Sequence, residues 1–239
     1  MAGVFPPAMF VFTRQYSLFI LTLHALVSAV GLCAEHDGDI RYWQTLAFNF
    51  HENEDWRFKG LVQTRLFDDA DFLGAYLFVP TVEYKLSDQV DIGATYLHQG
   101  IRGECTDAYT MLNIYWLHAT SRWKINDKMG FTMRNVLAYR DYENGVYADY
   151  WLTRNRFALG YTIEEMGRLV ASGISAELFY DLEEGYLSEV RTVPLSLTFR
   201  LTDQVKLTLY GMVQSKNYCT KGSDWEHAYV LGQTLSYNF

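Results

Sequence analysis

The chain has 239 residues, of which 49% are hydrophobic and 16% aromatic, and its formal charge at pH 7 is −8. The acidic balance argues against a nucleic-acid partner, because polyanion binding needs a basic surface. With only four prolines and no low-complexity linker, the sequence shows no sign of a second domain. A mean hydropathy of −0.10 in so aromatic a chain indicates that apolar and polar residues alternate.

Residues 1–34 are predicted to be a secretory signal peptide. They carry one basic residue, Arg14, no acidic residue, and an apolar run that ends at Cys33, followed by small Ala34 at the expected cleavage point. Lipid anchoring through Cys33 is disfavoured, because leucine and not a small residue precedes it. No later stretch reaches the roughly 18 consecutive apolar residues of a spanning helix. We therefore expect Sec-type export of a domain over 35–239.

Eleven strand-like runs with polar punctuation follow, and most are near or above the roughly 9–11 residues with which a strand crosses a bilayer. They lie at 41–50, 56–65, 76–86, 90–98, 108–125, 129–142, 148–161, 169–182, 186–201, 205–218 and 226–239. This rhythm predicts an all-β fold, a single antiparallel up-and-down transmembrane β-barrel of about 10–12 strands. Single-chain bacterial barrels have even strand numbers. Either 41–50 or 108–125 is therefore expected to be wrongly assigned, which leaves ten and twelve strands open.

Tight and loose connections alternate along the chain. Tight turns are predicted at 87–89, 126–128 and 202–204, and looser loops at 66–75, 99–107, 143–147 and 219–225. Counting back from Phe239 puts every tight turn on the periplasmic side and every loose loop outside, as in outer-membrane barrels. Cys105 and Cys219 both fall in outer loops. Export permits a disulfide between them, and a bridge and two separate thiols stay equally open.

The chain ends on a strand whose faces differ in polarity. Leu235, Tyr237 and Phe239 form one apolar edge, whereas the residues between them are small and polar. A terminal aromatic at this spacing resembles the signal by which the outer-membrane assembly machinery recognises barrels. We therefore expect location in the bacterial outer membrane, with its lipids and that machinery as partners. An amphipathic last strand of a soluble sandwich is the competing interpretation.

Long charged side chains gather on the polar faces of the predicted strands. Facing lipid would cost about 2–4 kcal/mol for each mid-membrane Arg or Lys, so these side chains are expected to face the lumen. The lumen-facing candidates are Arg57, Arg65, Glu83, Arg122, Arg134, Arg154, Arg156, Glu177 and Asp181. They predict either ion pairs that fill a narrow barrel or a charged constriction that selects small solutes. Pro194 indicates a bulge, which obscures the faces of 186–194.

Aromatic residues are plentiful near the predicted strand ends, where interfacial girdles place them. The expected girdle comprises Trp43, Trp56, Trp116, Trp123, Trp151, Trp225, Tyr139, Tyr161, Tyr180, Tyr210 and Tyr237.

Several landmarks recur in a characteristic order. They are YWQ at 42–44, DWRF at 55–58 leading to Arg65, VEYKLSDQVDIGATYLH at 82–98, Arg154 and Arg156 in LTRNRFALGY, and ELFYDL at 177–182. In this order they resemble the outer-membrane barrel family called domain of unknown function 2490, over nearly all of the exported chain. The resemblance implies a barrel with an early Trp and inward arginines. It implies no established activity.

No catalytic, metal or cofactor motif emerges. An outer-membrane lipid hydrolase would need a nucleophile beside a base, but Ser121 is predicted on the face opposite His118. The other histidines that could serve, such as His98, lie in polar segments without metal spacing. We expect a non-enzymatic barrel with a structural role or a role in passing a small solute. A lipid hydrolase and a soluble exported ligand-binding β-barrel are the alternatives.

Overall fold

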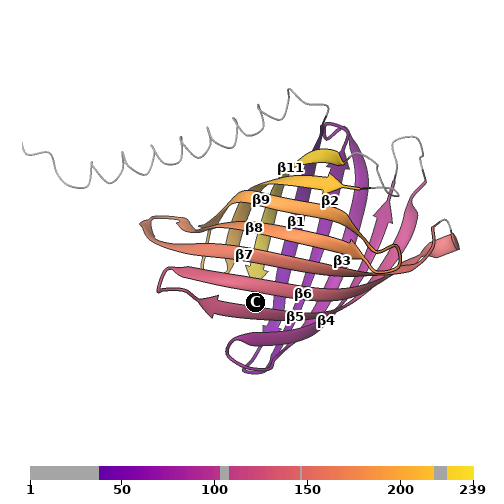
Figure 1. Cartoon of the computed structure of the whole chain (residues 1–239). Helices are drawn as coiled ribbons and strands as arrows, with labels where there is room; N and C mark the ends of the chain where they lie inside the picture. The colour runs from indigo at the N-terminus through magenta and orange to yellow at the C-terminus, as the bar shows by residue number, and fades with distance from the viewer. Residues whose placement is uncertain (1–37, 103–107, 146, 218–224) are drawn as a thin grey trace, which may run out of the picture. The chain divides into compact units, whose positions relative to one another are not determined.

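The computed structural model describes residues 38–102, 108–145, 147–217 and 225–239 (Figure 1). The predicted signal peptide over 1–34, and Cys105 and Cys219, lie outside the described residues. Among the residues that are described, no helix is long and apolar enough to span a membrane.

In the described residues from Asp39 to Phe239, eleven strands and one 3₁₀ turn, η1 (Glu143–Gly145), form the domain. The strands are β1 (Asp39–Glu52), β2 (Trp56–Phe67), β3 (Phe72–Lys85), β4 (Val90–Ile101), β5 (Thr110–Lys124), β6 (Met129–Tyr142), β7 (Tyr150–Met166), β8 (Leu169–Asp181), β9 (Tyr186–Arg200), β10 (Val205–Lys216) and β11 (Glu226–Asn238). Every predicted run is therefore a strand, and the all-β barrel is confirmed.

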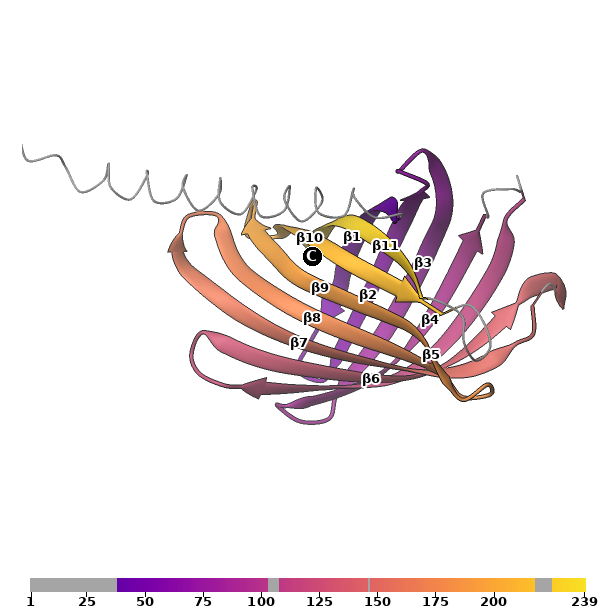
Figure 2. The same cartoon turned by 45° about the horizontal axis from the view of Figure 1, so that its top comes forward.

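The barrel closes through one parallel pair. Consecutive strands are antiparallel neighbours from β1 to β11, and β1 then pairs with β11 in parallel, from Asp39 opposite Ala228 to Asn49 opposite Asn238 (Figures 1 and 2). The expectation of an even strand number was wrong. The expectation that 41–50 or 108–125 is wrongly assigned was also wrong, because both runs are strands of the barrel. A parallel ladder also satisfies the backbone groups of both strands, so an odd number of strands can close without a free edge.

The tight turns lie together at one end of the barrel. Backbone hydrogen bonds join Phe239 to Asn49 (3.2 Å) and Asn238 to Gln204 (3.0 Å). Similar bonds of 2.8 Å join Arg122 to Gln89 and Thr162 to Lys128. We call this end the turn end and the opposite end the loop end. The predicted tight turns lie at the turn end and the predicted looser connections at the loop end. The prediction of a loose loop at 66–75 was wrong in length, because β2 extends to Phe67 and β3 begins at Phe72, so a four-residue turn joins them.

Side chains alternate between a buried inner face and an exposed outer face. On β3, Leu77 and Val79 are 3% and 5% exposed, whereas Phe78 between them is 52% exposed. The outer face carries Phe50, Trp56, Phe58, Tyr96, Tyr115, Leu117, Trp123, Leu137, Trp151, Tyr161, Ile174, Tyr180 and Leu235. The register of β9 shifts against both neighbours around Val193 and Pro194, at the predicted bulge.

Apolar side chains fill part of the interior. One buried cluster extends over β3 to β8 and includes Leu77, Leu112 and Phe179. A second cluster on β1, β10 and β11 comprises Trp43, Met212 and Val230. Each fully buried side chain of this size stabilises the fold by about 1.5–3 kcal/mol. The inner face is therefore partly a packed core and partly a charged surface.

Three of the predicted girdle aromatics lie inside the barrel. Trp43 is 4% exposed and belongs to the second cluster, and Trp116 packs against the first. Tyr210 lies over Gly232, where a Cβ would come within 2.0 Å of its ring. The expectation that these three rings face the membrane interface was wrong, because they share the parity of the buried positions on their strands.

Candidate functional site: the charged lumen

The inner face of the barrel carries all nine predicted lumen-facing residues. Arg57 and Arg65 lie on β2, Glu83 on β3, Arg122 on β5, Arg134 on β6, Arg154 and Arg156 on β7, and Glu177 and Asp181 on β8. The charged residues of the inner face divide into two groups that differ in how their charges are paired. The charges around Asp91 and Glu83 on β1 to β5 are called the balanced wall, and those on β6 to β9 the arginine wall.

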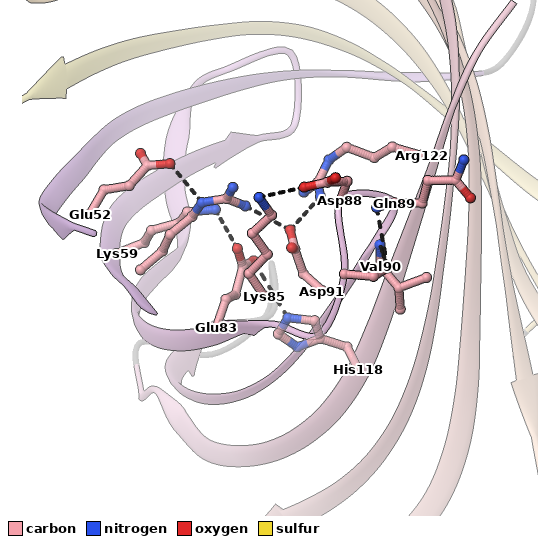
Figure 3. A network of polar contacts seen from close by, with 12 residues as sticks. Glu52, Lys59, Glu83, Lys85, Asp88, Gln89, Val90, Asp91, His118 and Arg122 are labelled. Atoms are coloured by element: carbon pink, nitrogen blue, oxygen red, sulfur yellow. Dashed lines mark hydrogen bonds and ion pairs between the residues drawn. The ribbon is translucent and has the colours of Figure 1, made fainter. Parts of the chain in front are cut away.

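Asp91 is the centre of the balanced wall (Figure 3). Its side chain is 3% exposed, and its carboxylate accepts hydrogen bonds from Arg57 Nη1 at 2.7 Å and from Arg122. Arg57 also donates through Nε to Glu52 Oε1 at 2.7 Å. Two carboxylates therefore hold two guanidiniums and connect β1, β2, β4 and β5.

Glu83 forms a second centre next to Asp91. Lys59 Nζ donates to Glu83 Oε2 at 2.5 Å, and His118 Nε2 lies 3.5 Å from Glu83 Oε1 (Figure 3). Gly93 stands between Glu83 and His118 in the register. A Cβ on Gly93 would come within 2.6 Å of both His118 Nε2 and the Val82 carbonyl. The missing side chain therefore lets the carboxylate and the imidazole meet over β4.

An exposed ion pair borders this group at the turn end. Lys85 Nζ lies 2.8 Å from Asp88 Oδ1, and Asp88 is fully exposed in its turn (Figure 3). The hydrogen bond from Lys85 and its positive charge lower the pKa of Asp88 below its ordinary value. Solvent screens such a pair, so it adds little to stability.

The arginine wall has more cations than acids. Away from the tight turns, five arginines face inward on β6 to β9, and three carboxylates accompany them. The arginines are Arg134, Arg140, Arg154, Arg156 and Arg191, and the acids are Glu177, Asp181 and Glu189. This excess is the reverse of the acidic charge of the whole chain.

Two of these arginines have carboxylate partners. Arg154 donates through Nε to Glu177 Oε1 at 2.5 Å and through Nη2 to Oε2 at 3.0 Å, a two-pronged ion pair. Arg191 Nε donates to Glu189 Oε1 at 2.5 Å, and Gln214 donates to the same oxygen. Charge-assisted pairs of this geometry are strong and directional.

Guanidinium groups and aromatic rings alternate in one continuous stack. Its members in order are Arg65, Trp43, Arg191, Phe179, Arg154 and Trp116. Successive distances from guanidinium carbon to ring centroid are 4.0, 5.3, 4.6, 5.1 and 4.9 Å. Cation–π contacts inside a protein each contribute about 2 kcal/mol. The stack therefore holds three arginines of the lumen in place, with members from β2, β1, β9, β8, β7 and β5.

Arg134 and Arg156 differ from their neighbours. They stand directly opposite each other on β6 and β7, and no carboxylate of the described residues forms an ion pair with either. Arg134 Nε is buried without a hydrogen-bond partner, whereas Arg156 is exposed. Because Arg156 lies on the inner face near the middle of its strand, its exposure marks water-accessible space within the lumen.

Several residues of this site had no place in the sequence-based set, among them Asp91, Glu189, Arg191 and Gln214. Asp91 shares the inward parity of Thr95 and Leu97, and that parity could have identified it. Asp91 also comes two residues after the predicted turn at 87–89, where acidic side chains are usually solvated. The bulge at Pro194 obscured the parity of β9.

The histidines do not form a catalytic group with the predicted partners. His118 faces the lumen with no exposed side-chain surface, whereas Ser121 lies on the outer face. His98 contacts Asn113 Oδ1 at 2.9 Å. On the outer face near the loop end, Ser215 Oγ lies 2.9 Å from His227 Nδ1. Within the described ranges, no three His, Cys, Asp or Glu side chains are placed to hold a metal ion.

A hollow of about 710 Å³ lies on the outer wall rather than in the lumen. Trp56, Ile92, Leu117 and Leu137 line it with outward side chains from β2 to β6. Gly93 and His118, which lie beside Glu83, also border it.

Comparisons with known proteins agree with this architecture. No curated protein matches the chain in sequence. The solved structure of the NanC porin is similar, with a TM-score of 0.53 and 12% sequence identity over 84% of this chain and 99% of that one. At this identity the likeness shows the fold alone, a porin-like β-barrel. The family model described as protein of unknown function (DUF2490) matches residues 40–225, so the chain belongs to the DUF2490 family.

Proposed function

We propose that this barrel spans the bacterial outer membrane and lets small anionic solutes pass through its lumen. The porin-like fold supports the membrane location, and so does the outer face, where large apolar and aromatic side chains are exposed while the charges are enclosed. The proposal includes export with cleavage after Ala34 and recognition of Leu235, Tyr237 and Phe239 by the assembly machinery. N-terminal sequencing of the protein from outer membranes should then begin at Glu35.

The observation that carries the preference for anions is the pair Arg134 and Arg156. Both face the lumen, and neither has a carboxylate partner among the described side chains. In a narrow passage with low-dielectric walls, unpaired cations raise the local concentration of anions and repel cations. The paired charges elsewhere in the lumen narrow it without adding net charge.

Planar-bilayer recording of the purified protein tests this function. We expect stepwise conductance, with a reversal potential in a KCl gradient that indicates preference for chloride. A protein that inserts into vesicles but never gives conductance steps would refute solute passage and favour a purely structural barrel. Extraction of the protein from cell envelopes by carbonate alone would refute the membrane location.

Lipid hydrolysis is the second candidate, and the contact between Ser215 and His227 is the observation that favours it. Hydroxyl and imidazole are at hydrogen-bond distance on the outer face. However, His227 has no second partner among the described residues to orient its ring. We therefore propose that the protein is not an enzyme. Release of fatty acid from phospholipid vesicles by the purified protein, abolished by Ser215→Ala, would overturn this.

A further inference from the structure

We infer that Arg134, Arg156 and Thr120 form a binding subsite for an oxyanion group, a carboxylate or a phosphate, of the solute. The inference rests on the proposed function because it names the chemical group for which the unpaired arginines are suited. It depends on how the charges are ordered along one row of cross-strand neighbours.

Five inward residues form this row. Asp91 stands opposite Thr120, Thr120 opposite Arg134, Arg134 opposite Arg156, and Arg156 opposite Glu177. Two cations therefore occupy the middle of the row, and a carboxylate ends it on each side. From sequence register alone, each central arginine would be expected to pair with the nearer acid.

Both acids are instead committed to other arginines. Asp91 accepts hydrogen bonds from Arg57 and Arg122. Glu177 uses both of its oxygens for Arg154. The acids next to the central cations are thus engaged by other arginines, and Arg134 and Arg156 face each other without an ion pair to either acid.

Like charges directly opposite each other on neighbouring strands destabilise a sheet. A buried Nε–H without a partner adds a further cost, and Arg134 has one. An anion between the two guanidiniums would remove both costs at once. The space is accessible, because Arg156 is exposed to the lumen.

The donor geometry fits an oxyanion better than a halide. Each guanidinium presents a planar fork that matches two oxygens of a carboxylate or phosphate. Thr120 is 6% exposed, and its hydroxyl makes no hydrogen bond to any other residue in the described part of the chain, so it can donate a third bond. Chloride would be attracted by the positive charge, but it has no pair of oxygens to match the two N–H groups of a guanidinium.

Calorimetric titration of the purified full chain in detergent tests the subsite. The probes are inorganic phosphate and acetate, each compared with chloride at constant ionic strength. We expect phosphate or acetate to bind more tightly than chloride. Arg134→Gln and Arg156→Gln should each weaken that binding by about tenfold or more, the effect of losing one charge-assisted hydrogen bond.

Matched controls separate geometry from charge and folding. Arg168→Gln removes the same charge from an exposed turn-end position and should leave binding unchanged. Arg156→Lys keeps the charge without the fork, and should weaken oxyanion binding while the preference for anions in conductance persists. Far-UV circular dichroism confirms that each variant is folded.

The outcomes distinguish the subsite from the channel. Oxyanion binding that depends on both arginines, in a protein without conductance, would support the subsite and refute solute passage. Conductance that prefers anions, with phosphate and acetate binding unchanged in both glutamine variants, would overturn the subsite alone. Equal binding of chloride and both oxyanions would also overturn it.

Discussion

The two walls of the lumen contain the same types of charged residue but pair them differently. On the balanced wall, Asp91 and Glu83 each hold basic partners, and the network joins five strands (Figure 3). On the arginine wall, Arg134 and Arg156 stand opposite each other, and neither forms an ion pair with a carboxylate of the described residues. Under the function proposed above, the paired charges of one wall contribute to stability, whereas the unpaired arginines of the other are available to a solute.

The comparison predicts that removing a charge has opposite effects at positions with an ion-pair partner and at the unpartnered pair Arg134 and Arg156. A partnered buried charge leaves an uncompensated ion behind when its partner is lost, which is strongly destabilising. Removing an unpartnered cation that lies beside another cation instead lowers the repulsion between them. Unfolding of the purified barrel by urea in lipid vesicles measures both effects on one scale.

The largest expected effect belongs to Asp91→Asn. The change leaves Arg57 and Arg122 without their carboxylate inside the barrel, and should lower the free energy of unfolding by about 3 kcal/mol. This is the low end of the range for a broken buried pair, because Arg122 is 41% exposed. An unfolding midpoint equal to that of the unmodified protein would show that the network does not stabilise the balanced wall.

Gly93→Ala should have the next largest effect. The new methyl group would meet both the His118 ring and the Val82 carbonyl, and the backbone carbonyl cannot swing away. Overpacking of this kind costs about 1–3 kcal/mol. The combination with His118→Ala should recover part of the loss in the same urea titration, and no recovery would mean that the ring is not the obstacle.

Arg134→Gln should change stability least among the buried sites, and in the opposite direction. Removing one of two facing cations relieves repulsion, so we expect a gain of less than about 1 kcal/mol. Arg154→Gln is the matched comparison, because it leaves Glu177 buried without its partner and should destabilise the barrel. Equal losses from both substitutions would mean that Arg134 has an acidic partner after all.

Asp88→Asn should have no measurable effect on unfolding at neutral pH. The carboxylate is exposed and its partner Lys85 is flexible, so solvent already screens the pair. A clear loss of stability in this variant would show that the turn end depends on surface charges as well as on Asp91.

The sequence was sufficient to predict the strands and the inner face, because alternation of polarity is a local signal. Phe78 and Leu77 show it directly, with opposite exposure at adjacent positions. Closure was not predictable in the same way. Turn lengths define which consecutive strands pair, but nothing local to 39–52 or 226–238 indicates that these two segments pair in parallel.

Which acid pairs with which arginine could not be predicted from the sequence either. Arg134 and Glu177 were both expected in the lumen, but partner choice depends on side-chain reach across strands. Arg154 takes Glu177 although Arg156 is its direct neighbour in the register. Trp43 was assigned to the interface because tryptophan is common there, whereas its parity places it between Arg65 and Arg191.

The reversal potential of single channels in a KCl gradient tests the central claim most directly. The unmodified protein should prefer chloride, and the double variant Arg134→Gln with Arg156→Gln should lose most of that preference while still conducting. A preference for potassium in the unmodified protein, or an unchanged chloride preference in the double variant, would contradict the role assigned to the arginine wall.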